Sequence, residues 1–364
     1  MTIDFANLTK AYLEHKSNID EAINNVVSTS RFIMGKEVVE LESALEEYTG
    51  AKYAISCSSG TDALLLAMMA LDIKPGDEII TTPFTFIATA ETIAFLGAIP
   101  VFVDIDERTY NIDVNRIEEK INERTKAIMP VSLYGQIADM DEINKLGRKH
   151  NIVVIEDAAQ SFGATYKGGK SCNLSTIGCT SFFPAKPLGC YGDGGALFTN
   201  DEQLANKIKS MRVHGQTQRY MHKYVGMGGR LDTLQAAVLL EKLKYYENDV
   251  KRRQAVARQY DQHLQNIAII PFIKEEKTSV WAQYSIRVNK REEVQSTLKK
   301  KGIPTAVHYP KPLHLQECFE YLGYTKGDFP ISEKVSNEIM SLPMNPYLTS
   351  EEINYIAEEL KKIL

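Results

Sequence analysis

Hydrophobic and polar positions alternate in a regular order between residues 50 and 200. Short runs rich in apolar and β-branched residues are separated by longer segments with apolar residues at helical spacing. The short runs predict strands at 53–57, 78–82, 100–105, 127–132, 152–156, 180–183 and 196–199. The segments between them predict helices near 61–71, 85–97, 114–122, 139–149 and 201–212. This alternation predicts an α/β fold with a mostly parallel, seven-stranded sheet and helices on both faces.

The pattern changes beyond residue 230. Residues 232–265 have the spacing of one long helix, and shorter elements follow it. These are a strand-like run and two helices, at 281–288, 291–301 and 350–363. They predict a smaller C-terminal α/β domain.

A chain of 364 residues exceeds what one compact core usually holds. We therefore expect two domains, a large α/β domain over residues 1–240 and a small one over 241–364. The large domain includes a polar, mostly helical segment of about fifty residues at its N-terminal end, and we expect this segment to pack against the smaller domain.

The composition of the chain excludes some classes of binding partner. The chain is 44% hydrophobic and 24% charged with a net charge of −5, so it offers no basic surface for nucleic acid or an anionic membrane. No apolar run approaches the roughly eighteen residues of a membrane span, and the N-terminal residues do not form a signal-peptide pattern. The five cysteines form no C-x-x-C pair and the seven histidines no H-E-x-x-H motif. We expect reduced thiols, no metal site and a cytoplasmic location.

Two residues just past strand ends could act together. Ligands of open α/β sheets bind at the carboxyl ends of strands, where Asp157 and Lys186 are both expected. Pyridoxal phosphate (PLP) requires a lysine for its Schiff base and an acid beside its pyridine nitrogen. The alternatives are a solvated surface lysine and a helix-capping aspartate.

Further candidates lie on the same expected edge. Gly60 and Thr61 open a helix after the first strand, where free N–H groups suit a phosphate, although capping would also explain them. Phe86 would cover a flat ring or pack in the core. Gln160 would hydrogen-bond the phenolic oxygen of the cofactor, and Ser181 would contact its phosphate.

Two segments further along the chain suggest substrate contacts. Arg230 lies at a loop-to-helix junction and suits a carboxylate or phosphate, or else pairs with Asp232. His308 and Tyr309 end an apolar stretch, where a structural histidine is the alternative.

Together these motifs resemble a known family. The chain is similar, over nearly its whole length, to the PLP-dependent sugar-nucleotide aminotransferases of the DegT/StrS type, which have the fold-type-I aspartate aminotransferase architecture. The likeness is carried by Ser-Gly-Thr-Asp-Ala-Leu at 59–64, Pro-Phe-Thr-Phe-Ile-Ala-Thr at 83–89, Pro-Val-Ser-Leu-Tyr-Gly-Gln at 130–136, Glu-Asp-Ala-Ala-Gln at 156–160 and the run around Lys186.

The resemblance assigns roles to the candidate residues. It implies that Lys186 forms the Schiff base and then shuttles protons. Asp157 and Gln160 hold the pyridine nitrogen and the ring hydroxyl, and Phe86 stacks on the ring. Phosphate contacts are implied for Gly60, Thr61 and Ser181, and sugar-nucleotide contacts for Phe32, Ala185, Arg230, His308 and Tyr309. The family further implies L-glutamate as amino donor and a homodimer with shared active sites.

Within the family, residues 171–176, 186–192 and 306–310 are most similar to the aminotransferases of UDP-2-acetamido-2-deoxy-3-oxo-glucuronate. This likeness implies transfer of an amino group to the 3-keto carbon of a UDP-linked 2-acetamido-3-oxo-uronate, for surface polysaccharide (O-antigen) synthesis. The alternatives are a dTDP-keto-deoxy sugar as substrate and a PLP-binding regulatory protein. Relatives with histidine in place of the lysine are dehydratases, and Lys186 argues against that branch.

Two positions depart from the family pattern. Many relatives have asparagine at the position of Gly228, where it reaches the phosphate of a neighbouring subunit. Phe32 often corresponds to tyrosine, so a hydroxyl that could bind substrate is missing here.

Overall fold

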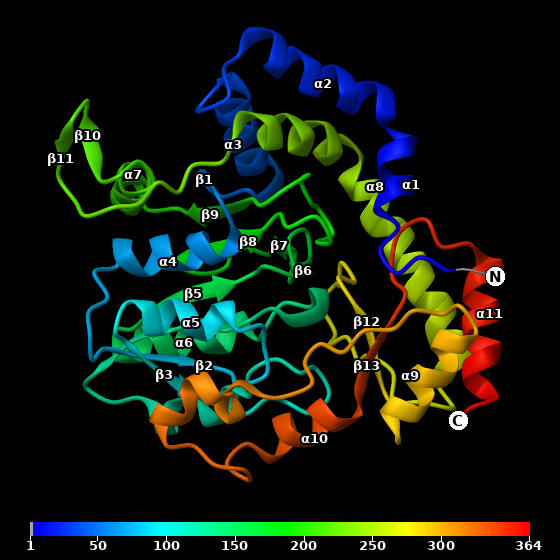
Figure 1. Cartoon of the computed structure of the whole chain (residues 1–364). Coiled ribbons are helices and arrows are strands. Elements are labelled where there is room, and N and C mark those ends of the chain that lie inside the picture. Colours follow the sequence, from blue (N-terminus) through cyan, green and yellow to red (C-terminus); the bar gives the residue numbers. More distant parts are fainter. Residues whose placement is uncertain (1–2) are drawn as a thin grey trace.

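The centre of the larger domain is a mixed sheet, seen in the computed structural model of the chain, which describes residues 3–364 (Figure 1). Within those residues the sheet has seven strands in the order β1-β9-β8-β5-β4-β2-β3. Their bounds are Tyr53–Cys57 (β1), Glu78–Thr81 (β2), Ile99–Phe102 (β3), Thr125–Ile128 (β4), Val153–Asp157 (β5), Ile177–Ser181 (β8) and Gly195–Thr199 (β9). Only β9 runs antiparallel to its neighbours, β1 and β8. The predicted mostly parallel sheet is confirmed.

Helices cover both faces of this sheet. One face packs against α4 (Gly60–Ala70), α5 (Ala88–Phe95) and α7 (Glu202–Met211). The other packs against α3 (Lys36–Thr49), α6 (Met140–His150) and α8 (Thr233–Leu264). The strands are therefore buried on both sides, which explains why they appear in the sequence as short apolar runs without alternation.

One predicted helix is absent. Residues 114–122 form only two short 3₁₀ turns, η1 (Val114–Arg116) and η2 (Glu118–Lys120). The Asn122 backbone N–H and side chain bond within a turn to Thr125 and Arg124, which ends the segment before a second helical turn can form. A helix this short gains too few hydrogen bonds to offset its nucleation cost.

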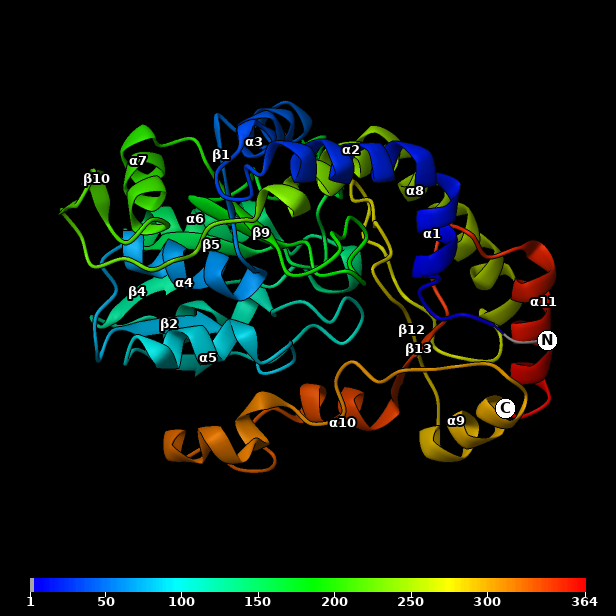
Figure 2. The same ribbon diagram turned by 45° about the horizontal axis from the view of Figure 1, so that its top comes forward.

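The smaller domain is built on two antiparallel strands, β12 (Tyr284–Arg287) and β13 (Ile339–Leu342). They pack against α9 (Arg291–Lys300), α11 (Ser350–Lys361) and the last turns of α8. Figure 2 shows α8 running from the larger domain into the smaller one. Its side chains join the larger core up to Val250 and the smaller core from Val256. The expected division at residue 240 falls inside this continuous helix and remains a prediction.

The N-terminal segment packs differently from our expectation. It forms α1 (Leu8–Glu14), α2 (Lys16–Thr29) and α3. Val38, Leu41 and Leu45 of α3 enter the core of the larger domain, whereas Ile3 enters that of the smaller. The expectation that this segment packs against the smaller domain is therefore wrong for α3. Its apolar residues are spaced along one helix face, and that face lies on the sheet.

The segment after His308 returns to the larger domain. It contains η4 (Leu313–Leu315), η5 (Glu317–Leu322) and α10 (Pro330–Glu338), and its apolar side chains pack on Phe84 and Phe102 at the edge of the sheet. This packing holds the 306–310 loop beside the carboxyl ends of the strands.

Short elements complete the chain. They are η3 (Leu133–Gly135) and two hairpins, β6–β7 (Thr165–Tyr166 and Gly169–Lys170) and β10–β11 (Gln216–Gln218 and Met221–His222). The β10–β11 hairpin projects from the body of the larger domain (Figure 1). Among the described residues, no helix combines the length and apolar character needed to cross a membrane.

Candidate active site

A cavity of about 520 Å³ lies where β5 and β8 end, beside the start of α4 and the 306–310 loop. Most residues singled out in the sequence line it together, namely Gly60, Thr61, Phe86, Asp157, Gln160, Ser181, Ala185, Lys186, His308 and Tyr309. They come from separate strands, helices and loops of both domains. The fold therefore brings these side chains together at one edge of the sheet, as expected.

The start of α4 offers an anion cradle. Ser59 caps the helix by accepting from the Asp62 N–H at 3.0 Å. Across residues 3–364, the N–H groups of Gly60 and Thr61 meet no protein acceptor, and the next helical bond starts at Ala63. Unpaired N–H groups and the positive end of the helix dipole together favour a phosphate.

Gly60 is required by close packing in this cradle. A Cβ atom at position 60 would lie 2.6 Å from the Ser181 Cβ and 3.1 Å from its Oγ. The absence of a side chain brings the Ser181 hydroxyl beside the free N–H groups. The arrangement therefore supplies backbone and hydroxyl donors to one point, as a phosphate needs.

Asp157 is buried at the end of β5 and held from both sides. Its Oδ2 accepts from the Thr89 hydroxyl at 2.7 Å and its Oδ1 from the Ala159 N–H at 3.2 Å. Burial raises the pKa of Asp157, while these two donors and the nearby Lys186 oppose the rise. A cationic ring nitrogen placed beside this carboxylate would keep it ionised.

Lys186 lies in the loop after β8 and lines the same cavity. Burial lowers the pKa of its amine, and the attraction of Asp157 only partly offsets this. Its side chain is partly accessible from the cavity although surrounding protein desolvates the amine. A lysine with a lowered pKa is more often neutral, which a nucleophile or base must be.

Gln160 bridges the two domains above the cavity. Its side-chain oxygen accepts from the Tyr134 N–H at 2.9 Å, and its amide nitrogen donates to the Tyr309 hydroxyl at 3.1 Å. That nitrogen has a second hydrogen, which is free for the ring hydroxyl predicted as its partner.

Phe86 is 53% exposed although it lines the cavity, with its ring centroid 6.2 Å from that of Tyr309. An exposed aromatic side chain at a cavity wall suits stacking on a flat ligand ring. The alternative of a core aromatic fits the neighbouring Phe84 instead, which is fully buried.

Phe32 and Arg230 lie apart from the cavity lining. The Phe32 carbonyl accepts from the Thr233 N–H at 2.9 Å, so both residues lie near the start of α8. Arg230 does not pair with Asp232, and its buried Nε has no acceptor within the described part of the chain. An arginine without a protein partner is suited to an anionic ligand.

Sequence reasoning missed the hydroxyls behind Asp157. Thr85 and Thr89 are buried and share a hydrogen bond at 3.1 Å, and Thr89 continues it to the carboxylate. The only indication in the sequence was that Thr85 and Thr89 are four residues apart, near the start of a predicted helix and next to Phe86. Gln283 was also missed; it lines the cavity, and its buried Oε1 is without a partner in residues 3–364.

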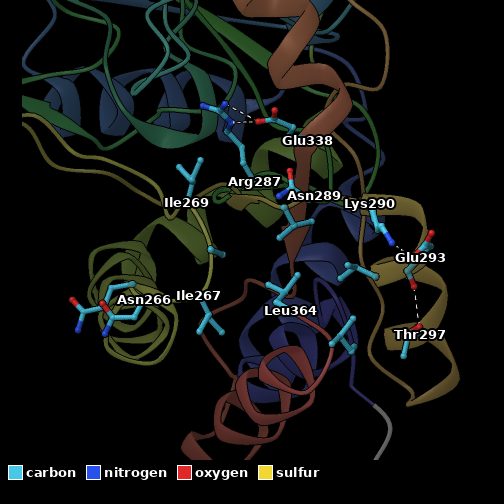
Figure 3. A pocket seen from close by; sticks show the side chains of 15 residues that line it. Asn266, Ile267, Ile269, Arg287, Asn289, Lys290, Glu293, Thr297, Glu338 and Leu364 are labelled. Carbon is cyan, nitrogen blue, oxygen red and sulfur yellow. Dashed lines mark hydrogen bonds and ion pairs between the residues drawn. The ribbon is translucent and has the colours of Figure 1, made fainter.

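A larger hollow of about 710 Å³ lies in the small domain (Figure 3). Its charged side chains are already paired, Arg287 with Glu338 at 2.6 Å and Lys290 with Glu293 at 3.7 Å. The residues predicted for the site all lie elsewhere. We therefore assign the chemistry to the cavity that contains Lys186.

The residues around that cavity fit PLP. The cradle at Gly60 matches a phosphate, the buried carboxylate of Asp157 a pyridinium, and the Lys186 amine with its lowered pKa an aldehyde. In the described chain, no group of three or more His, Cys, Asp or Glu side chains could hold a metal ion.

Comparisons with known proteins identify the family of the chain. The profile of the DegT/DnrJ/EryC1/StrS aminotransferase family matches residues 14–361. The UDP-2-acetamido-2-deoxy-3-oxo-D-glucuronate aminotransferase of Pseudomonas aeruginosa is 54% identical over 98% of this chain and 99% of its own. The dTDP-3-amino-3,6-dideoxy-alpha-D-galactopyranose transaminase of Aneurinibacillus thermoaerophilus is 41% identical over 99% of both chains.

A solved structure extends the likeness to the cofactor. NtdA of Bacillus subtilis, with bound cofactor PMP, is 30% identical with a TM-score of 0.92. The match covers 100% of this chain and 85% of that one.

Proposed function

Because the chain belongs to the DegT/DnrJ/EryC1/StrS aminotransferase family, we propose that it transfers an amino group from L-glutamate to the 3-keto carbon of a UDP-linked 2-acetamido-3-oxo-uronate. The product is a 3-amino sugar nucleotide. The chemistry rests on one observation, that Lys186 and Asp157 line the same cavity beside a phosphate cradle.

When bound, PLP supplies an aldehyde carbon that takes up the amino group and a ring that withdraws electrons. The protein supplies position and proton transfer. The N–H groups of Gly60 and Thr61 and the Ser181 hydroxyl would hold the phosphate, and Asp157 would keep the ring nitrogen protonated. Phe86 would stack on the ring, and Gln160 would hydrogen-bond its hydroxyl.

Lys186 moves the proton. Its amine Nζ, whose pKa burial lowers, would take the proton from the Cα of the amino donor when it is in its neutral form. The same Nζ later returns a proton to the carbon that carries the new amine. A regulatory protein on this scaffold would need neither the lysine nor its lowered pKa.

The nature of the substrate rests on the 54% identity to the Pseudomonas aeruginosa enzyme and on the site. A UDP-linked uronate carries a diphosphate and a carboxylate. His308, Tyr309 and Ala185 line the cavity that would receive the sugar, and Arg230, whose Nε has no acceptor in residues 3–364, offers a partner for an anionic group.

We also propose a homodimer with shared active sites. Phe32 and Arg230 lie outside the lining of the cavity of their own chain, which leaves them available to the cavity of a second copy. The exposed Tyr220, Met221 and Val225, on and after the β10–β11 hairpin, supply apolar surface for such an interface.

Surface-polysaccharide (O-antigen) synthesis in the cytoplasm is the setting that we propose. Amino uronates linked to UDP are building blocks of the kind that a polysaccharide requires. All five cysteines lie within the described residues as free thiols, four of them buried, which suits a reducing compartment.

The test is a direct competition. Holoenzyme with glutamate is offered the UDP-linked 3-oxo-uronate and a dTDP-keto-deoxyhexose together, and mass spectrometry identifies the amino sugar formed. We expect the UDP product, and Lys186→Ala should lower turnover by at least roughly 10²–10⁴-fold. Preference for the dTDP sugar would refute the substrate assignment, and undiminished turnover by the lysine variant would refute the mechanism.

A further inference from the structure

His308 has one ring nitrogen occupied inside the protein. Its Nδ1 lies 2.9 Å from the Ser341 hydroxyl, while the ring lines the cavity that contains Lys186. Burial, with a further contribution from Lys186, lowers the pKa of His308 to about 4. The ring is therefore neutral near pH 7 and carries one N–H, so the position of that hydrogen decides whether its free nitrogen donates or accepts.

Two serines lie behind the ring. Ser341 of β13 is opposite Ser285 of β12, and their hydroxyls are 2.9 Å apart, both fully buried. The Ser341 backbone also exchanges two hydrogen bonds with Ala306, at 2.8 and 3.2 Å. Ala306 is two residues before His308, so the strand fixes the loop as well as the ring.

Other groups surround His308 without contacting its nitrogens. The Tyr134 hydroxyl donates to the His308 carbonyl, and the Tyr309 and Phe5 rings lie with centroids 5.9 and 6.5 Å from the imidazole. Lys186 is the nearby cation. The serine pair is thus the polar group that sets the tautomer.

The direction of the hydrogens follows from what each hydroxyl can reach. If Ser285 donates to Ser341 and Ser341 donates to Nδ1, each buried hydroxyl hydrogen has an acceptor. In the reverse direction Nδ1–H donates to Ser341, Ser341 donates to Ser285, and the Ser285 hydrogen turns to the Tyr134 oxygen, which lies within its reach. The first direction is favoured because an imidazole nitrogen is a stronger hydrogen-bond acceptor than a phenolic oxygen.

We propose that Ser341, backed by Ser285, is a positioning residue that holds His308 as the tautomer protonated on Nε2, so that the ring donates to an oxygen of the bound sugar nucleotide. This inference rests on the proposed function, whose substrate presents carboxylate, phosphate and carbonyl oxygens to the cavity. A bare nitrogen lone pair in that place would repel them.

Nitrogen-15 NMR of histidine-labelled holoenzyme tests the tautomer without any substrate. The His308 signals are identified by comparison with His308→Gln. Near pH 7 we expect a protonated Nε2 and a bare, hydrogen-bonded Nδ1, and in Ser341→Ala we expect a mixture of tautomers. Protonation of Nδ1 in the wild type would overturn the inference.

Kinetics test the consequence. Ser341→Ala should raise KM for the sugar nucleotide by roughly tenfold, while the half-reaction with glutamate stays within about twofold of wild type. Ser341→Thr, which restores a hydroxyl, should recover most of the loss. Ser336→Ala is the matched control, since Ser336 is buried and its hydroxyl has no partner in the described chain.

An unchanged KM in a folded Ser341→Ala protein would also refute the inference. Should that variant fail to fold, the KM of Ser285→Ala and the NMR tautomer of the wild type test the inference instead. Failure of the proposed function is separate, because wild-type holoenzyme would then not convert the UDP sugar whatever its tautomer.

Discussion

At the scale of residues, one buried site must keep Lys186 neutral and Asp157 ionised. The lysine must lose its proton to act as nucleophile or base, and burial lowers its pKa. The aspartate must stay ionised to hold a pyridinium, whereas burial raises its pKa. Hydrogen bonds resolve the conflict, because Thr89 and the Ala159 N–H stabilise only the carboxylate.

The support from Thr89 can be removed without changing the shape of the side chain. Thr89→Val deletes the donor to Asp157, so the pKa of Asp157 should rise further and its hold on the ring nitrogen weaken. We expect kcat/KM for glutamate to fall roughly 10–100-fold. Thr92→Val is the control, because the Thr92 hydroxyl, also buried in α5, bonds the Ala88 carbonyl instead. Equal losses in both variants would mean that the effect is structural.

His308 should contribute to the pH dependence of the free energy of unfolding. Its pKa is about 4 in the folded chain, against 6.5 for an unperturbed histidine side chain. Between these values the unfolded chain binds one more proton, so the free energy of unfolding should fall as pH decreases from 6.5 to 4. Urea unfolding at several pH values should show a shallower fall for His308→Gln. The exposed His222, changed to Gln, should leave the slope unaltered.

At the scale of elements, α8 holds the loop that carries Lys186. The Lys242 amine donates to the Gly189 carbonyl, and the Gln235 side chain accepts from the Tyr191 N–H at 2.8 Å. Within this loop, the Cys190 thiol also donates a hydrogen bond to the Phe182 carbonyl at 2.9 Å. Because the end of α8 belongs to the smaller core, this helix couples the lysine loop to that domain.

Lys242 is itself a desolvated lysine, and burial lowers its pKa to about 8 from 10.5. Between pH 8 and 10.5 the unfolded chain binds the extra proton, so the free energy of unfolding should rise with pH by up to about 3 kcal/mol. Lys242→Met should abolish this rise, as followed by urea unfolding. Lys244→Met, on the exposed side of the same helix, should keep it. A rise that survives in Lys242→Met would contradict the assignment.

The elements were largely predictable, because buried parallel strands and amphipathic helices leave strong local patterns. The long helix expected at 232–265 is α8 at Thr233–Leu264. The failure at 114–122 arose because apolar spacing does not reveal that Asn122 starts a turn. The hydroxyls of Thr85, Thr89, Ser285 and Ser341 could not be assigned, since a threonine or serine in a buried segment has no pattern that identifies its partner.

At the scale of the whole molecule, the site requires contacts between segments far apart in sequence. Gln160 and Tyr309 are 149 residues apart and bond at 3.1 Å. The family resemblance indicated that Gln160 and Tyr309 share a site. Local sequence patterns could not indicate against which domain α3 packs. Phe32 and Arg230 lie outside the cavity lining, and the proposed homodimer would bring them to the site of a second copy.

The shared site can be checked by mixing variants. Lys186→Ala and Arg230→Ala are each expected to lose most turnover of the sugar nucleotide. If Arg230 serves the cavity of the other subunit, mixed dimers of the two variants contain one complete site and should regain roughly a quarter to a half of wild-type activity. The oligomeric state is followed by light scattering. Mixed dimers that form without regaining activity would place Arg230 in the site of its own chain.

Lys186 is the lysine that we expect to bond the cofactor. Borohydride reduction of holoenzyme, followed by peptide mass spectrometry, locates that bond. We expect a cofactor adduct on the peptide that contains Lys186, and its loss when glutamate is added before reduction. An adduct on Lys242 or another lysine, or one that glutamate does not remove, would rule out this role for Lys186.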